Sequence, residues 1–317
     1  MKKIVLLIFI IPLLFPLFSF GQQDSQYTQY MYNTVVVNPA YTGSRGVLSM
    51  MGLHRSQWLG LDGAPSTQTL SVHSPINEKN KLGLGLSIIN DKAGPANETN
   101  FSVSASYTVP VSKKGKLSFG VSGGGNLLNV DIISLRKFNE NDALTEQDIT
   151  GNFNPSIGAG LYFRTDRFYA GLSVPNVLET NHFDEESITV NSLQTSVLAQ
   201  ERINYYLIAG HVFELKPLIK FKPAILAKYV MGSPIQVDLS ANFMFYDTFT
   251  IGASYRYSEA LSALAGFQIS EALMIGFSYD KEITELGSTR YNKGTYEVIL
   301  RFELKRVYSR LLTPRFF

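Results

Sequence analysis

The chain has 317 residues, a formal net charge of +2 and no cysteine, and 45% of its residues are hydrophobic. The absence of cysteine excludes both a disulfide framework and a lipoprotein anchor. Two of the basic residues, Lys2 and Lys3, belong to a leader; without them the formal charge is 0, which leaves no basic surface for binding nucleic acid.

Residues 1–21 are typical of a secretory signal peptide. Two lysines precede an apolar run over residues 4–20, and Ser19 and Gly21 occupy positions −3 and −1 of a cleavage site before Gln22. A membrane anchor is the alternative, but two prolines interrupt the run, which is short for a bilayer-spanning helix of about 20 residues. We therefore expect cleavage near Gly21/Gln22 and export from the cytoplasm.

Residues 22–44 form an irregular segment, and residues 26–46, which include most of it, read QYTQYMYNTVVVNPAYTGSRG. The stretch has no helical period, and Asn-Pro and Thr-Gly are turn-forming pairs. We expect it to lie at the periplasmic mouth of the following domain or to fold into its lumen as a plug.

This segment also contains most of the candidate partner-binding residues. Tyrosine with glutamine and asparagine supplies stacking area and hydrogen bonds together, the mixture found at protein recognition surfaces. The candidates are Tyr27, Tyr30, Tyr32, Asn38, Pro39, Tyr41 and the single tryptophan, Trp58. Trp58 can alternatively be an anchor at a membrane interface.

Residues 45–305 alternate between apolar and polar side chains with a period of two, which indicates β-strands. A clear case is residues 261–269, where Leu261, Ala265 and Phe267 share one face and Ser262 and Gln268 the other. A soluble sandwich and a membrane barrel both place such strands in series. Strands of about ten residues with aromatic ends and polar faces rich in Gly, Ser, Asn and Gln favour the membrane barrel. We predict an all-β fold, a transmembrane antiparallel β-barrel of about 14 strands, followed by a C-terminal tail, 306–317.

The strand count is even, as in bacterial outer-membrane barrels. The predicted strands are 45–55, 66–76, 81–91, 99–110, 115–129, 153–164, 167–176, 203–214, 217–231, 234–246, 248–258, 260–269, 271–281 and 294–305. The long connections 130–152, 177–202 and 282–293 follow the fifth, seventh and thirteenth of these strands, so all three leave one rim. We expect that rim to face the outside, because extracellular loops are long and periplasmic turns short.

No catalytic set, metal site or cofactor site emerges from the sequence, and we predict that the protein is not an enzyme. The four histidines are scattered without ligand spacing, and the carboxylates at 142–148 and 184–186 are typical of solvated loops. Gly83–Gly85 and Gly158–Gly160 are expected to face the barrel interior. For Gly123–Gly125 a β-bulge is favoured, and a close approach to something inside the barrel is the alternative. Large residues at inward positions, Tyr169, Leu226 and Met244, favour a filled lumen.

Several motifs resemble the PorP/SprF family of outer-membrane proteins of type IX secretion in Bacteroidota. They are QYTQYMYN, NPAYTGSRG, HRSQWLGLDGAPSTQTLSVHSP, LGLGLSIINDKAGP, GLSVPN, FKPAILAKYVMGSPIQVDLSANF and GASYRYSEALSALAGFQI, which together extend over nearly the whole mature chain. The run Thr34–Val37 departs from the family pattern.

The resemblance implies a bacterial outer-membrane location and an accessory role in protein secretion, including the secretion of proteins used in gliding motility. Its partners would be the secretion machinery and a secreted surface protein such as a large adhesin, bound without catalysis, with outer-membrane lipid around the barrel. No nucleic acid or small-molecule substrate is expected. The alternative is a passive porin or small-solute channel, for which an open lumen would suffice.

Overall fold

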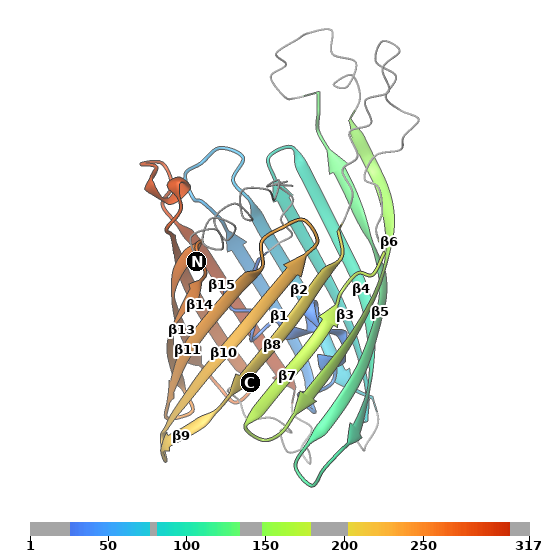
Figure 1. The fold of residues 1–317 in the computed structure, drawn as a ribbon, viewed down its shortest axis with the longest axis vertical. Helices are drawn as coiled ribbons and strands as arrows, with labels where there is room; N and C mark the ends of the chain where they lie inside the picture. The colour runs from blue at the N-terminus through green and yellow to red at the C-terminus, as the bar shows by residue number, and fades with distance from the viewer. Residues whose placement is uncertain (1–25, 77–80, 134–147, 179–201, 305–317) are drawn as a thin grey trace, which may run out of the picture.

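The computed structural model describes residues 26–76, 81–133, 148–178 and 202–304. They form a closed antiparallel barrel of 14 strands, which confirms the predicted fold class (Figure 1). The strands are β1 (Leu48–Ser56), β2 (Ser66–Pro75), β3 (Leu82–Ala93), β4 (Ala96–Pro110), β5 (Lys116–Val130), β6 (Ile149–Arg164), β7 (Phe168–Val174), β8 (Asn204–His211), β9 (Phe213–Lys216), β10 (Ile219–Val230), β11 (Gln236–Phe245), β12 (Phe249–Arg256), β13 (Ala260–Gln268), β14 (Leu273–Glu282) and β15 (Thr295–Leu304). Segments β8 and β9 both pair with β10 and are two parts of one barrel strand, interrupted at Val212. The predicted signal peptide and C-terminal tail lie outside the described residues.

The sheet closes on itself because β10 pairs with β11 as well as with β8 and β9. Every pairing is antiparallel between neighbours in the chain, apart from the β1–β15 closure, so the connections alternate between two rims. The connections after β5, β7 and β14 are the longest and share a rim, which we call the long-loop rim; the opposite end is the short-turn rim. Residues 134–147 and 179–201 of the two longest loops lie outside the described residues.

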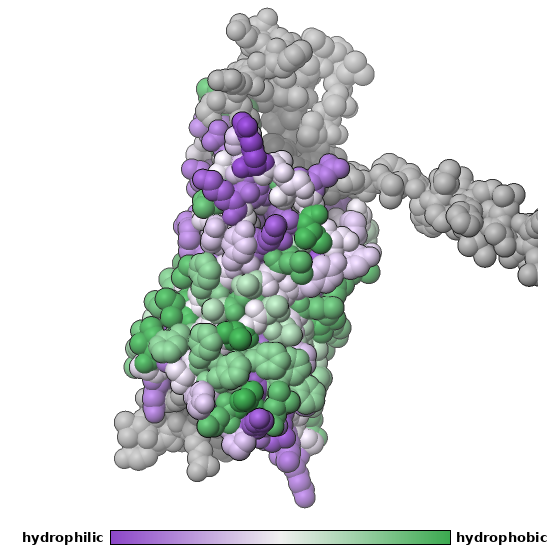
Figure 2. All heavy atoms as spheres, turned by 90° about the vertical axis from the view of Figure 1, so that its left-hand side faces the viewer, coloured by the Kyte–Doolittle hydropathy of each residue, from purple (hydrophilic) through white to green (hydrophobic). Residues whose placement is uncertain are grey.

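The outer face of the barrel is apolar. In β13, Leu261, Ala263, Ala265 and Phe267 are exposed, whereas Leu264 is buried toward the interior, in agreement with the predicted alternation. Figure 2 shows on one side of the barrel a band of hydrophobic residues between hydrophilic ends. A strand that presents apolar side chains outward and closes every backbone hydrogen bond with its neighbours suits a lipid environment.

The inner face carries polar side chains and a few large residues. Tyr169, Leu226 and Met244 are buried inside, as predicted, at 4%, 5% and 6% exposure. None of the helices in the described ranges has the length and hydrophobicity that crossing a membrane would require.

The predicted bulge at Gly123–Gly125 is wrong. These glycines pair in continuous register with β4 and β6, and the irregularity in β5 lies between Leu128 and Val130. Two of the three make room for neighbours: an added Cβ at Gly124 would meet the backbone of Phe101, and one at Gly125 would lie 2.2 Å from the ring of Phe153. Phe153 also stacks on Phe101 at 6.2 Å between ring centroids, so a side chain at Gly125 would separate this aromatic pair on the outer face.

Candidate functional site: the N-terminal segment in the barrel lumen

Residues 26–47, which we call the lumen segment, run through the inside of the barrel (Figure 1). Nearly all of them are buried, although they precede the first strand. The segment contains one turn of α-helix, α2 (Thr34–Val37), and a 3-10 turn, η2 (Pro39–Tyr41). The expectation of a wholly irregular segment is therefore incomplete, because the burial of Thr34, Val35 and Val37 stabilises a turn that is too short to form alone.

The segment crosses the lumen from the long-loop rim to the short-turn rim. Its start lies near the long-loop rim, where the amide of Gln26 donates to the side chain of Gln236, the first residue of β11. Its end lies near the short-turn rim, where the backbone N–H of Gly43 donates to His73 Nδ1 close to the end of β2. The chain then turns back and enters β1. The described residues of the segment thus occupy the lumen, one of the two places expected from the sequence.

A cluster of buried charged residues holds the part of the segment near the long-loop rim. The carboxylate of Glu297 in β15 accepts two successive backbone N–H groups, from Thr28 at 3.0 Å and from Gln29 at 2.9 Å. The hydroxyl of Thr28 donates to Asp280 and accepts from Arg55. Arg55 forms ion pairs with both carboxylates, at 2.9 Å to Asp280 and 3.2 Å to Glu297. Hydrogen bonds to charged groups are among the stronger ones in proteins. This cluster therefore fixes the position of the segment along the barrel axis.

The tyrosines of the segment fill the space between the walls. Tyr27, Tyr30, Tyr32 and Tyr41 are at most 8% exposed and belong to one apolar cluster with wall residues from β1, β6, β7, β8, β10, β11, β13, β14 and β15. The Tyr41 ring packs edge-on against Tyr162 of β6, with 5.2 Å between the centroids. Two wall cations lie over the ring of Tyr32: these are Lys222 at 5.1 Å and Arg301 at 5.6 Å. Such contacts of a desolvated cation with an aromatic face are favourable.

Glycines in the wall allow the backbone of the segment to approach the lower part of the barrel. A Cβ at Gly120 would lie 2.2 Å from the backbone nitrogen of Ala40, and one at Gly160 would lie 2.2 Å from the side-chain oxygen of Asn38. Asn38 caps η2 by accepting from the N–H of Ala40, and its amide donates to the carbonyl of Leu161 in β6. The inward glycines are therefore contact positions for the turn around Pro39, which explains part of the glycine pattern in the strands.

Further buried ion pairs lie at both ends of the lumen. Near the short-turn rim, Arg45 of the segment pairs with Glu303 of β15 through two hydrogen bonds, at 2.7 and 3.1 Å. Near the long-loop rim, Arg256 pairs with Asp238 at 2.8 Å. Burial raises the pKa of Glu259 in the nearby β12–β13 turn, and the Arg256 guanidinium opposes this rise.

Trp58 lies apart from the other candidate residues, in the loop between β1 and β2 at the long-loop rim. Its backbone N–H donates to the hydroxyl of Thr295 at 3.2 Å, and its indole N–H donates to Glu282 at the end of β14. The same loop is tied to the β14–β15 connection by backbone hydrogen bonds between Leu59 and the pair Lys293 and Gly294. Trp58 is half-buried, with a left-handed φ of 48°.

The structure therefore places six of the seven candidate residues in the lumen and one at the rim. Their predicted role in partner binding stays a prediction. The wall residues that hold the segment, above all Arg55, Asp280 and Glu297, are not among the seven residues predicted from the sequence. Their signal was a charge at an inward position of a membrane strand, which requires a partner inside the barrel.

Within the described ranges, no group of three or more His, Asp or Glu side chains is placed to hold a metal ion. The predictions that the chain has no metal, cofactor or catalytic residue stay predictions. The buried carboxylates found here are engaged in ion pairs and hydrogen bonds with the segment and the wall.

A family model described as type IX secretion system membrane protein PorP/SprF matches residues 19–302. The chain belongs to this family. The resemblance seen in the sequence motifs is thereby confirmed, and the barrel fold together with the family supports an outer-membrane location for this PorP/SprF protein. The family is one of secretion-system membrane proteins and not a known class of enzyme. No match is found among curated proteins.

Solved structures with a related fold share little sequence with this PorP/SprF protein. The outer membrane protein Omp33 of Acinetobacter baumannii is 9% identical, over 83% of this chain and 100% of that chain, with a TM-score of 0.47. The toluene transporter TbuX of Ralstonia pickettii is 10% identical, over 84% and 92%, with a TM-score of 0.49. A Pseudomonas aeruginosa FadL homologue is 12% identical, over 90% and 96%, with a TM-score of 0.48. Similarities this remote carry no information about function.

Proposed function

We propose that this protein is an accessory component of type IX secretion whose lumen is closed by its own N-terminal segment. It supports the export or surface attachment of a specific secreted protein, such as a large adhesin, by binding and not by catalysis. The long-loop rim faces the outside of the cell and the short-turn rim faces the periplasm, as expected from the loop lengths.

One observation carries this proposal: the lumen segment crosses the whole barrel and is held at both ends by buried charges. Glu297 binds it near the long-loop rim, and Glu303 binds it through Arg45 near the short-turn rim. A passive channel needs an open path lined by polar groups. A barrel whose path is occupied by an anchored segment is better suited to present a surface to another protein.

Under this proposal the tyrosines of the segment fill the lumen, and the long-loop rim provides the contact with the secreted protein. Of the seven candidates, we propose Trp58 for that contact, because it lies at the long-loop rim. The loop that carries it is held in a fixed shape by its hydrogen bonds to the β14–β15 connection. A rigid aromatic residue on a fixed loop is typical of binding hot spots.

Co-purification from outer membranes tests the proposal. The full-length protein should retain a secreted protein of the type IX pathway together with components of the machinery. Trp58→Ala should weaken retention of the secreted protein, whereas Phe267→Ala, on the lipid face of β13, should leave it unchanged. If no secreted protein co-purifies with the native barrel, or if secretion is normal in cells that lack it, the proposed function is wrong.

A deletion of residues 26–37 separates closure from partner binding. Because it removes the upper half of the lumen segment, we expect a barrel that folds but is heat-labile in detergent gels. If the deleted barrel keeps its full heat resistance while display of the secreted protein fails, then the segment itself binds a partner. Full heat resistance together with normal display would contradict both roles.

A further inference from the structure

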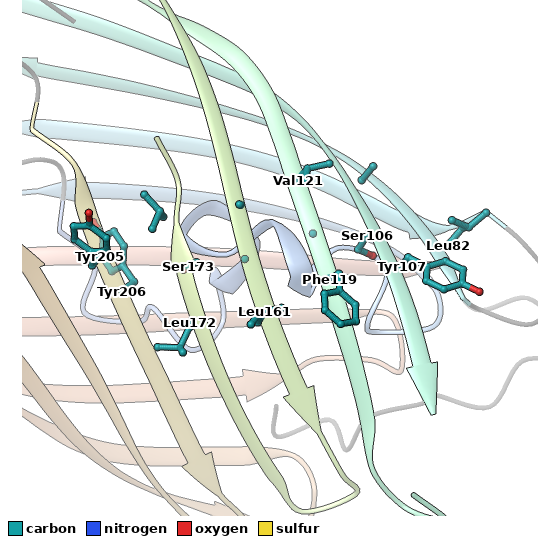
Figure 3. Close-up of a pocket in the computed structure, with 15 residues that line it drawn as sticks. Leu82, Ser106, Tyr107, Phe119, Val121, Leu161, Leu172, Ser173, Tyr205 and Tyr206 are labelled. Carbon is teal, nitrogen blue, oxygen red and sulfur yellow. The ribbon is translucent and has the colours of Figure 1, made fainter. Parts of the chain in front are cut away.

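A hollow lies on the outer, lipid-facing side of the barrel wall over β3–β8, with a volume of about 770 Å³ (Figure 3). Its lining is almost wholly apolar. Bulky side chains border it, among them Tyr107, Phe119, Leu161, Leu172 and Tyr205. These side chains belong to the face of the wall that contacts lipid, since each of them is more than 35% exposed.

The shape of the hollow follows from the strand register. One row across the sheet pairs Tyr107 with Phe119 and Phe119 with Leu161, so large side chains stand next to each other. The adjacent row pairs Ala105 with Val121 and Val121 with Ala159. Because the side chains of the second row are smaller than those of the first, they leave a groove above them on the outer surface.

The wall beneath the hollow is supported from inside. The inward neighbours Ser106 and Ser173 donate hydrogen bonds to backbone carbonyls of the lumen segment, those of Thr42 at 2.6 Å and Val37 at 2.7 Å. Gly120 and Gly160 lie against the turn around Pro39. Because the wall rests on this packed segment, the hollow is a preformed feature of the outer surface.

Two exposed lysines lie below the hollow, at the short-turn rim. Lys113 and Lys114 occupy the turn between β4 and β5, and among the described residues neither has a carboxylate partner. Lys114 lies in the turn two residues before β5 begins, and the first residue of β5, Lys116, is three residues from Phe119, roughly 10 Å at about 3.3 Å per residue. With a strand tilt of about 40°, this corresponds to roughly 8 Å along the membrane normal, and the turn with the two lysines lies beyond it, toward the headgroups.

We propose that the hollow is a specific binding site for a phospholipid with an anionic headgroup from the periplasmic leaflet. Its acyl chains occupy the groove beside Ala105 and Ala159, and its phosphate interacts with Lys113 and Lys114. Apolar area buried by the chains and attraction between the lysines and the phosphate both favour this occupant. The proposal depends on the orientation of the barrel but not on its role in secretion.

Native mass spectrometry of the full-length protein in mild detergent tests the site with added phosphatidylglycerol and phosphatidylcholine as probes. We expect one phosphatidylglycerol to be retained at least fivefold more strongly than phosphatidylcholine. The double variant Lys113→Gln/Lys114→Gln should reduce this preference to near one, whereas Lys216→Gln/Lys281→Gln, which removes two lysines elsewhere, should preserve it.

A second pair of variants tests the groove itself. Ala159→Phe fills the hollow and should reduce the retention of both lipids, whereas Ala263→Phe adds the same ring on the lipid face of β13 and should not. Equal retention by all variants, equal affinity for the two lipids, or the cross-linking of position 159 to a protein instead of lipid in native membranes would overturn the proposal.

Discussion

The contact between Glu297 and the lumen segment makes a sharp prediction, because a single carboxylate accepts two backbone N–H groups and pairs with Arg55. The residue is 1% exposed. Glu297→Gln keeps its shape, but it removes the charge and turns one of the two acceptor oxygens into a donor. That donor would face a backbone N–H or the guanidinium of Arg55, so at least one hydrogen bond is lost, and of its two ion pairs Arg55 keeps the one with Asp280, at 2.9 Å.

The size of the effect follows from these contacts. A hydrogen bond to a charged group contributes about 1.5–3 kcal/mol, and breaking a buried ion pair by removing one partner costs about 3–5 kcal/mol. Because Asp280 still compensates part of the Arg55 charge, we expect a loss of about 3 kcal/mol in the free energy that holds the upper lumen segment in place. At about 1.4 kcal/mol per factor of ten, the segment should open roughly a hundredfold more often.

Hydrogen exchange followed by mass spectrometry measures this opening directly. In the Glu297→Gln variant, the amides of Thr28 and Gln29 should exchange roughly a hundredfold faster, while amides in the β-strands keep their protection. The matched control is Glu214→Gln, in the exposed pair of Glu214 with Arg167, where the side chains are 53% and 58% exposed. An exposed pair contributes about 0–1 kcal/mol, so exchange in the segment should be unaffected. Unchanged exchange at Thr28 and Gln29 in the Glu297→Gln variant would refute the anchoring role of this carboxylate.

Three further predictions concern the wall and its orientation. Gly120→Val would collide with the backbone around Ala40 and should lower the free energy of unfolding of the purified barrel, measured by thermal denaturation, by about 1–3 kcal/mol. Gly123→Val, on the outward face of the same strand, meets open space and serves as the control. Equal losses in the two variants would mean that the close approach is unimportant. Ala265→Arg places a charge in lipid and should destabilise refolded barrels by about 2–4 kcal/mol in a denaturant titration. Ser262→Arg, on the inner face of the same strand, should destabilise them less. The reverse order would argue for a soluble core. An epitope inserted after Thr289 should bind antibody on intact cells, and one inserted after Pro217 should bind only after lysis; the opposite result would invert the barrel.

The strands could be predicted because each carries its own signal. In β13 the alternation of Leu261, Ala265 and Phe267 with Ser262 and Gln268 defines both the strand and its two faces, since side chains in a strand point alternately to opposite sides. The filled lumen was also foreseen from large inward residues. Local periodicity is sufficient for these features because it depends on neighbours in the sequence.

The path of the lumen segment could not be predicted in the same way. Its decisive contacts join residues far apart in the chain: Thr28 and Glu297 are separated by 269 positions. An irregular segment has no period from which a register could be read. The glycines show the same limit, because Gly120 and Gly125 both look like weak points in β5. Only the fold shows that Gly120 receives the turn around Ala40 and that Gly125 lies under an aromatic ring.

Conductance of the purified full-length protein in a planar lipid bilayer tests the central claim, that the lumen is closed by the protein's own segment. We predict no steady open pore for the full-length protein, and steady conductance for the protein that lacks residues 26–37, because the deletion removes the part of the segment held by Glu297. The contradictory result is a steady open pore in the full-length protein with the same conductance as the deletion variant, which would make the barrel a passive channel.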